Sequence, residues 1–122
     1  MNKVQDTFVS STSWTERIGF VSAISTIDYF VKHKVGSSIK KNGKYLLNGW
    51  KKIAKKNDLK IKFTEFLGMP SFSFDYGRIN EKLHTYFTEL MLKKGYLATN
   101  GLTITYAHKK EDIDNYLKNC NQ

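Results

Sequence analysis

Hydrophobic residues recur at helical spacing near the start of the chain. Between residues 18 and 31 the apolar side chains form a wide face, which predicts a helix that is mostly buried. Ser13 stands three residues before Glu16, which is the spacing of a capping box at a helix start. Gly36 is expected to end this helix.

A second helix is predicted over residues 38–57. Its apolar residues share one stripe, while lysines cover the remaining surface. Gly43 and Gly49 lie inside this helix, where glycine lowers helix propensity. The residues of the apolar stripe are Ile39, Leu46, Trp50, Ile53 and Ala54.

Strict alternation of apolar and polar residues predicts three strands. Residues 59–63 and 71–75 flank a turn at Gly68-Met69-Pro70, and their spacing suits an antiparallel pair. Residues 102–106 alternate in the same way and are expected to form a third strand.

Two further helices complete the predicted order. One covers about residues 79–94 and is closed by Gly95, and the other covers residues 110–117 with acidic residues in its first turn. The resulting order of helix, helix, strand, strand, helix, strand and helix indicates an α+β fold, a small antiparallel sheet covered by helices. Without an internal repeat or a linker, residues 1–122 are treated as a single unit.

Composition excludes a disordered chain, because 40% of the residues are hydrophobic and 14% are aromatic. The net charge of +9 comes almost entirely from lysine, since Arg17 and Arg78 are the only arginines. The densest lysine run, between residues 40 and 62, is typical either of a nucleic-acid patch or of a solvated helix face. We favour the solvated face, because apolar residues keep helical spacing through the run and base readout relies on arginine. Nucleic acid is therefore not the expected partner.

The inventory of catalytic side chains is poor. Cys120 is the only cysteine and lies near the C-terminus, and no histidine has metal-ligand spacing to another histidine or to the cysteine. The chain has neither a phosphate-binding glycine loop nor an apolar run long enough to span a bilayer. These features favour a cytoplasmic protein without a metal or a membrane segment.

The segment Ser10-Ser11-Thr12-Ser13 gathers four hydroxyls directly before the first predicted helix. A helix N-terminus presents unsatisfied N–H groups and partial positive charge, and both favour phosphate. On its own this pattern is weak, because N-capping explains Ser13 equally well.

The string Ser10-Ser11-Thr12-Ser13-Trp14-Thr15-Glu16-Arg17-Ile18-Gly19 resembles a segment of class III pyridoxal-phosphate-dependent aminotransferases. The most similar group is that of the glutamate-1-semialdehyde aminomutases. Further segments resemble the C-terminal part of that family in the same order along almost the whole chain. They are Gly49-Trp50, Gly68-Met69-Pro70, Phe87-Thr88-Glu89-Leu90-Met91 and residues 107–117.

The resemblance implies the C-terminal part of a homodimeric enzyme with the type I pyridoxal-phosphate fold. Residues 1 to about 35 would form the helix that leads out of the large domain, and about 36–122 the small C-terminal domain. The enzyme would move an amino group between an amine donor and a carbonyl. Thr12, with Ser11 beside it, would bind the phosphate of pyridoxal 5′-phosphate held by the partner subunit.

Departures from the family pattern limit what this chain is expected to do alone. Phe20 replaces the family's proline, and Ser13 replaces an aromatic residue. The Schiff-base lysine, the acid at the pyridine nitrogen and the aromatic that stacks on the ring have no match here. We therefore expect no catalytic residue in this chain and no activity from it alone, unless a separate N-terminal polypeptide supplies them.

The first helix, apolar nearly all round, is expected to pack on something absent and to promote self-association. A small basic nucleic-acid-binding domain and a non-catalytic assembly protein remain the alternative functions.

Overall fold

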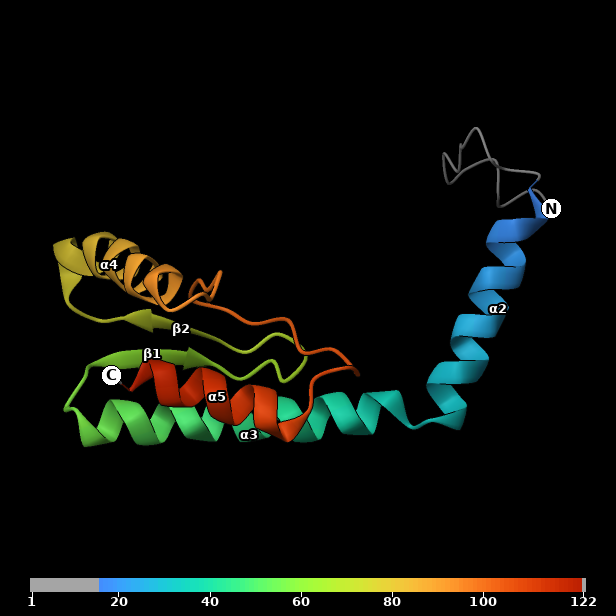
Figure 1. The fold of residues 1–122 in the computed structure, drawn as a ribbon, viewed down its shortest axis with the longest axis horizontal. Coiled ribbons are helices and arrows are strands. Elements are labelled where there is room, and N and C mark those ends of the chain that lie inside the picture. Colours follow the sequence, from blue (N-terminus) through green and yellow to red (C-terminus); the bar gives the residue numbers. More distant parts are fainter. Residues whose placement is uncertain (1–15, 122) are drawn as a thin grey trace. The chain divides into compact units, whose positions relative to one another are not determined.

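The computed structural model describes residues 16–121 of the chain. Within them it contains four α-helices and one two-stranded antiparallel sheet (Figure 1). The predicted α+β class is confirmed at that level. The elements are α2 (Arg17–Lys32), α3 (Val35–Lys56), β1 (Ile61–Thr64), β2 (Ser71–Phe74), the 3₁₀ turn η1 (Gly77–Ile79), α4 (Asn80–Lys93) and α5 (Lys110–Cys120).

The chain divides into two compact units, Met1–Val35 and Gly36–Gln122. The described part of the first unit is essentially α2, so the predicted helix over residues 18–31 is confirmed. No residue of α2 is buried, so the expectation of a mostly buried helix is wrong. The physical reason is that the described part of this unit contains no second element to cover the apolar side chains.

The start of α2 also differs from the prediction. Glu16 is the N-cap residue, with extended backbone and no side-chain capping bond, rather than the third helical residue of a capping box. Ser13, the expected cap, lies outside the described residues.

The break after α2 does not occur at Gly36, which lies in the first turn of α3. Instead, Lys34 takes the left-handed conformation, with φ of 50°, that glycine usually supplies at such a position. A side chain in this region costs about 1–2 kcal/mol. The position of the break could therefore not be predicted from the sequence, because lysine is not a residue that typically ends a helix in this conformation.

The second unit is built on α3, whose predicted stripe is confirmed. Leu46, Trp50 and Ala54 are buried, and the glycines inside the helix allow close approaches. A Cβ at Gly43 would lie 1.9 Å from the carbonyl oxygen of Leu67, and one at Gly49 would lie 2.3 Å from a methyl of Leu117. Gly43 therefore lets the turn after β1 contact the helix backbone.

The predicted hairpin is confirmed as β1 and β2. The two strands pair antiparallel, with Ile61 opposite Phe74 and Phe63 opposite Phe72. This register places the alternating aromatic residues on one face of the sheet, against the core.

The predicted third strand is wrong as a regular strand. Residues 100–104 run beside the start of β2, but within the described residues they form only one isolated bridge, Ser71 with Gly101. Three backbone hydrogen bonds nevertheless hold this segment: Phe72 N to Asn100 O at 2.8 Å, Leu102 N to Pro70 O at 3.1 Å, and Ile104 N to Gly68 O at 2.9 Å. Two of these three hydrogen bonds are to the turn before β2, so the segment does not form a regular ladder with the strand. The alternation of apolar and polar residues instead reflects the packing of Ile104 into the core.

The last two helices agree with the prediction, although α5 is one turn longer. Gly95 follows α4 with φ of +82°, as expected for a helix-ending glycine. At the start of α5, the backbone N–H of Lys109 donates to Asp112 Oδ2 at 2.8 Å.

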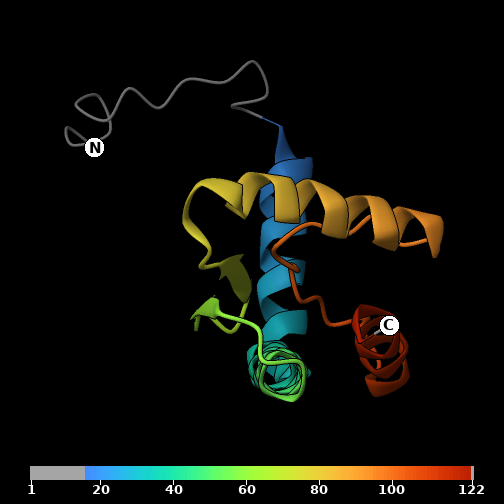
Figure 2. The ribbon, with the colours of Figure 1, turned by 90° about the vertical axis from the view of Figure 1, so that its left-hand side faces the viewer.

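The core lies between α3, α5, the hairpin and α4. Figure 2 looks along α3 and shows α5 beside it, the hairpin on its other flank and α4 across the opposite side. Its buried members are Leu46, Leu47, Trp50, Phe72, Met91, Ala98, Ile104, Ile113 and Tyr116.

Candidate functional site

The predicted phosphate-binding residues, Thr12 and Ser11, lie outside the described residues. The helix that follows them in the sequence, α2, is present and begins at Arg17. Nothing in the described part of the chain tests the role predicted for these two hydroxyls.

A Schiff-base lysine needs a desolvated amine with a lowered pKa. In two exposed lysines, Lys93 and Lys110, hydrogen bonds and charge from Glu89 and Asp114 instead raise the pKa. Lys94 is the only half-buried lysine among residues 16–121, and its Nζ donates to the carbonyl of Asn119 at 2.7 Å. The amines of these three lysines are therefore engaged with other groups of the protein.

Each of the three histidines contacts a neighbouring ring or backbone group of this chain. His33 stacks on Tyr29 one turn earlier, with ring centroids 4.1 Å apart. His84 lies against the ring of Phe74, with centroids 5.3 Å apart. His108 Nδ1 accepts the backbone N–H of Thr105 at 2.9 Å and so closes the turn before α5. Within residues 16–121 no group of three or more His, Cys, Asp or Glu side chains could hold a metal ion.

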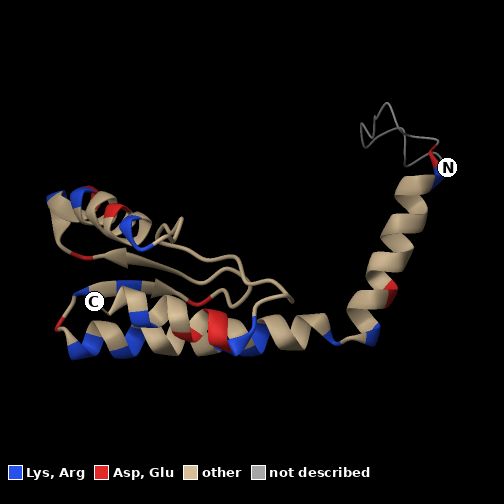
Figure 3. Ribbon diagram, in the orientation of Figure 1, with Lys and Arg blue, Asp and Glu red and all other residues tan. Residues whose placement is uncertain are grey.

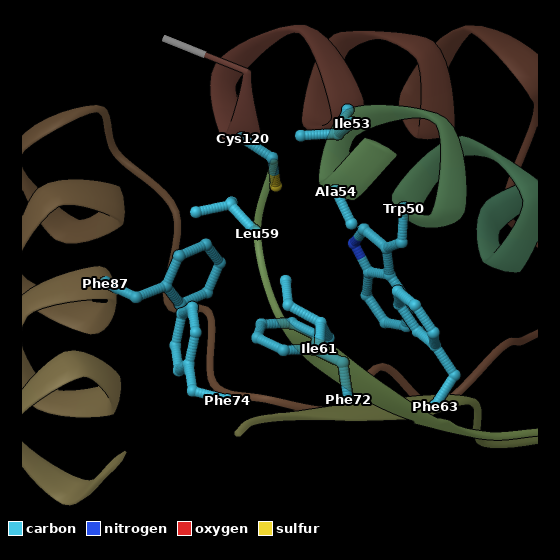
Figure 4. A pocket seen from close by; sticks show the side chains of 10 residues that line it. All are labelled: Trp50, Ile53, Ala54, Leu59, Ile61, Phe63, Phe72, Phe74, Phe87 and Cys120. Carbon is cyan, nitrogen blue, oxygen red and sulfur yellow. The ribbon is translucent and has the colours of Figure 1, made fainter. Parts of the chain in front are cut away.

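An apolar cavity of about 60 Å³ lies between α3, the hairpin, α4 and the end of α5. Figure 4 shows the sulfur of Cys120 directed into this space among the aromatic rings of both strands. Its lining residues are Trp50, Ile53, Ala54, Leu59, Ile61, Phe63, Phe72, Phe74, Phe87 and Cys120. The cavity is well below the roughly 150 Å³ of a cavity that holds benzene, and a nearly all-apolar lining offers water few partners. It is therefore a packing gap.

Cys120 is more firmly placed than its position near the C-terminus suggests. It is the last residue of α5 and packs against the core. Burial raises the pKa of its thiol. A thiol that stays protonated is a poor nucleophile. The apolar spacing of Ile113, Tyr116 and Cys120, three and four residues apart, is the sequence signal that could have extended the helix.

Lysines dominate the solvent side of α3. This lysine face comprises Lys40, Lys41, Lys44, Lys51, Lys52, Lys55 and Lys56. All seven are exposed, and α3 itself contains no acidic residue. In Figure 3 blue residues recur along α3, and the acidic residues of neighbouring α5 are red.

A polar cluster joins α3 to the first turns of α5. The hydroxyl of Tyr45 and the Nζ of Lys110 both donate to Asp114, and that Nζ lies 5.1 Å from the centre of the Tyr45 ring. These bonds, first that of Lys110 and then that of Tyr45, hold the pKa of Asp114 below its usual value. Asn42 Nδ2 adds a bond to the carbonyl of His108 at 2.9 Å. The two bonds that α3 side chains donate link residues 66 and 69 apart in sequence, so no local pattern could have predicted them.

Among the described residues, no helix is both long and apolar enough to cross a membrane. The comparisons with known proteins add no assignment: the chain matches no protein-family model, no curated protein and no solved structure.

Proposed function

We propose that this chain is the C-terminal part of a pyridoxal-phosphate-dependent class III aminotransferase or aminomutase, similar to the glutamate-1-semialdehyde aminomutases. In such an enzyme it would help to move an amino group between an amine donor and a carbonyl. A cytoplasmic homodimer with the type I fold belongs to the same proposal.

The observation that carries the proposal is the ordered series of family-like strings. It begins with Ser10-Ser11-Thr12-Ser13-Trp14-Thr15-Glu16-Arg17-Ile18-Gly19 and continues in order to residues 107–117. A short common string arises easily by chance, whereas several in one order over nearly the whole chain do not. The α+β unit over Gly36–Gln122 is compatible with a small C-terminal domain.

The character of α2 gives independent support. Its apolar side chains are largely exposed, with Ile24 at 61% and Ile27 at 62%, and within residues 16–35 nothing covers them. Contiguous exposed apolar surface marks a site of interaction. A helix leading out of a larger domain would have such a surface.

In this proposal the chain binds the cofactor through hydrogen bonds and forms no covalent bond to it. The hydroxyls of Thr12 and Ser11 would donate to the phosphate of pyridoxal 5′-phosphate held by the partner subunit, as charge-assisted hydrogen bonds. When bound, the cofactor supplies an electron sink for the reaction. The amine that holds the cofactor would come from a segment N-terminal to these residues, in the same or a separate polypeptide, because no lysine of this chain stands in the family's catalytic context.

The first test is the coding sequence upstream of Met1. The proposal expects it to encode a segment that carries the missing lysine in the family's context. Mixing that polypeptide with this chain and pyridoxal 5′-phosphate should then give a visible absorption band and turnover. After borohydride reduction, peptide mapping should place the cofactor on a lysine of the upstream polypeptide.

The phosphate contact is tested in the reconstituted enzyme with Thr12→Val, and Thr103→Val, in an exposed loop, is the matched control. Loss of a hydrogen bond to a charged group costs about 1.5–3 kcal/mol, so Thr12→Val should weaken retention of pyridoxal 5′-phosphate at least about tenfold. It should leave binding of pyridoxal, which lacks the phosphate, unchanged. Turnover by this chain alone, or the cofactor bound stoichiometrically to one of its own lysines, would overturn the proposal.

A further inference from the structure

We propose that the lysine face of α3 binds the phosphate backbone of nucleic acid without reading its sequence. This inference is independent of the proposed enzyme function. It rests on the placement of the lysines, on the small number of ion pairs that they make and on the burial of the opposite side of the helix.

The seven lysines lie on one side of α3. An α-helix turns by about 100° per residue, so their positions fall within a sector of about 160°. Leu46 and Trp50 lie on the other side and are buried in the core. The lysine face is therefore the outward side of a helix whose orientation is fixed by its packing.

Little negative charge offsets this surface. Of the seven lysines, only Lys51 has an ion pair within the described residues, with Glu65. Two of the three acidic side chains at the start of α5 are already engaged: Asp112 accepts the N–H of Lys109, and Asp114 accepts from Lys110 and Tyr45. The remaining six lysines keep their charge available to an external anion.

The chemistry of the face suits a phosphate backbone that is bound without reading the bases. Neither of the two arginines lies on α3, so bidentate contacts to base edges are not available there. The apolar side of α3 is buried, so this helix has no free face to insert into a lipid surface. The helix has 22 residues and is about 33 Å long, which is close to the length of one duplex turn of about 34 Å.

The regular apolar stripe of α3 does not argue against binding. It shows that the helix is packed, but the packed side and the lysine face are opposite. A solvated face and a phosphate-binding face have the same sequence pattern and differ in the affinity they confer.

The experiment measures the affinity of the full chain for a mixed-sequence 20-base-pair duplex by fluorescence anisotropy, over a series of salt concentrations. The test variant is Lys52→Gln/Lys55→Gln/Lys56→Gln. The control, Lys32→Gln/Lys34→Gln/Lys82→Gln, changes three exposed lysines outside α3. Both triple variants have a net charge of 9 − 3 = +6, so they differ only in where the charge is lost.

Each phosphate contact contributes about 0.9 to the slope of log affinity against log salt. The test variant should therefore bind at least about tenfold more weakly, and the magnitude of its slope should fall by about 2.7, which is three contacts at about 0.9 each. The control should change far less in both quantities. Replacing the same three residues with arginine should restore binding. Circular dichroism checks that all variants fold.

Three results would overturn the inference. They are equal loss in both triple variants, no detectable binding by the full chain at low salt, and equal binding to poly-glutamate or to anionic vesicles of matched charge.

Discussion

α2 and α3 follow one another in the sequence, yet the more apolar of the two helices is the more exposed. α2 is apolar nearly all round and has no buried residue, whereas α3 carries seven lysines and supplies much of the core. Apolar content alone therefore does not decide which helix is packed. α3 has partners within its own unit that come later in the chain, while the described part of the first unit gives α2 none.

The largest expected effect contrasts a buried and an exposed side chain in these two helices. Leu46 in α3 is fully buried, so Leu46→Ala should lower the free energy of unfolding by about 2–5 kcal/mol. Ile27 in α2 is 62% exposed, so Ile27→Ala should change it by no more than about 0.5 kcal/mol. Urea unfolding followed by circular dichroism measures both. A comparable loss in the two variants would mean that α2 is packed as tightly as α3.

The two helices also differ at their glycines. Gly43→Ala in α3 would place a methyl group against the Leu67 carbonyl, so it should destabilise the fold by about 1–3 kcal/mol. Gly19→Ala in α2 meets nothing within 4 Å and should instead favour the helix by about 1 kcal/mol. Circular dichroism should therefore show a lower unfolding temperature for Gly43→Ala, and a higher helix content for Gly19→Ala. Destabilisation by Gly19→Ala would reveal a neighbour close to that position.

Sequence patterns predicted what depends on local periodicity. Helical spacing of Leu46, Trp50 and Ala54 was sufficient to predict α3. The alternation of apolar and polar residues was sufficient to predict the hairpin. The hydroxyl segment around Thr12 was also recognisable from sequence, but as a candidate whose role still awaits a test.

Long-range contacts explain the errors. Alternation in residues 102–106 suggested a strand, but Ile104 is buried by the core while its neighbours bond mainly to the turn before β2. The break at Lys34 has no glycine to mark it, and the cluster of Tyr45 with Asp114 joins residues 69 apart. These features arise from tertiary structure, which a single sequence does not display.

The exposed face of α2 gives a third prediction. Ile24→Asp/Ile27→Asp should raise the concentration at which the chain self-associates at least about tenfold, because burial of each isoleucine contributes about 1.5–3 kcal/mol. Lys52→Gln/Lys55→Gln, on the exposed side of α3, is the matched control, because it lowers the net charge by the same amount, to 9 − 2 = +7. Light scattering over a concentration series should separate the two variants. Equal effects would assign association to charge rather than to the apolar helix.

The smallest expected effect concerns pH and the packed end of α5. Burial raises the pKa of the Cys120 thiol, so the folded chain holds that proton to higher pH than the unfolded chain does. Above the unfolded thiol pKa of about 8.5 the unfolded state binds fewer protons, so stability should fall as pH rises. Urea midpoints at about pH 7.5 and about pH 9.5 measure this loss, because this interval spans the unfolded thiol pKa and ends below the pKa of tyrosine, about 10, and of lysine, about 10.4.

Cys120→Ala provides the control for this effect. It removes the titrating thiol and should make the urea midpoint nearly independent of pH over the same interval, whatever its effect on stability at pH 7.5. The pKa of Tyr116 is also raised by burial, but an unfolded tyrosine with a pKa near 10 is only about one quarter ionised at pH 9.5, so its contribution over the interval is much smaller than that of the thiol. An unchanged pH dependence in Cys120→Ala would mean that the thiol is solvated and that the end of α5 is open. In that case α5 would resemble α2, with apolar side chains that have no partner, rather than α3.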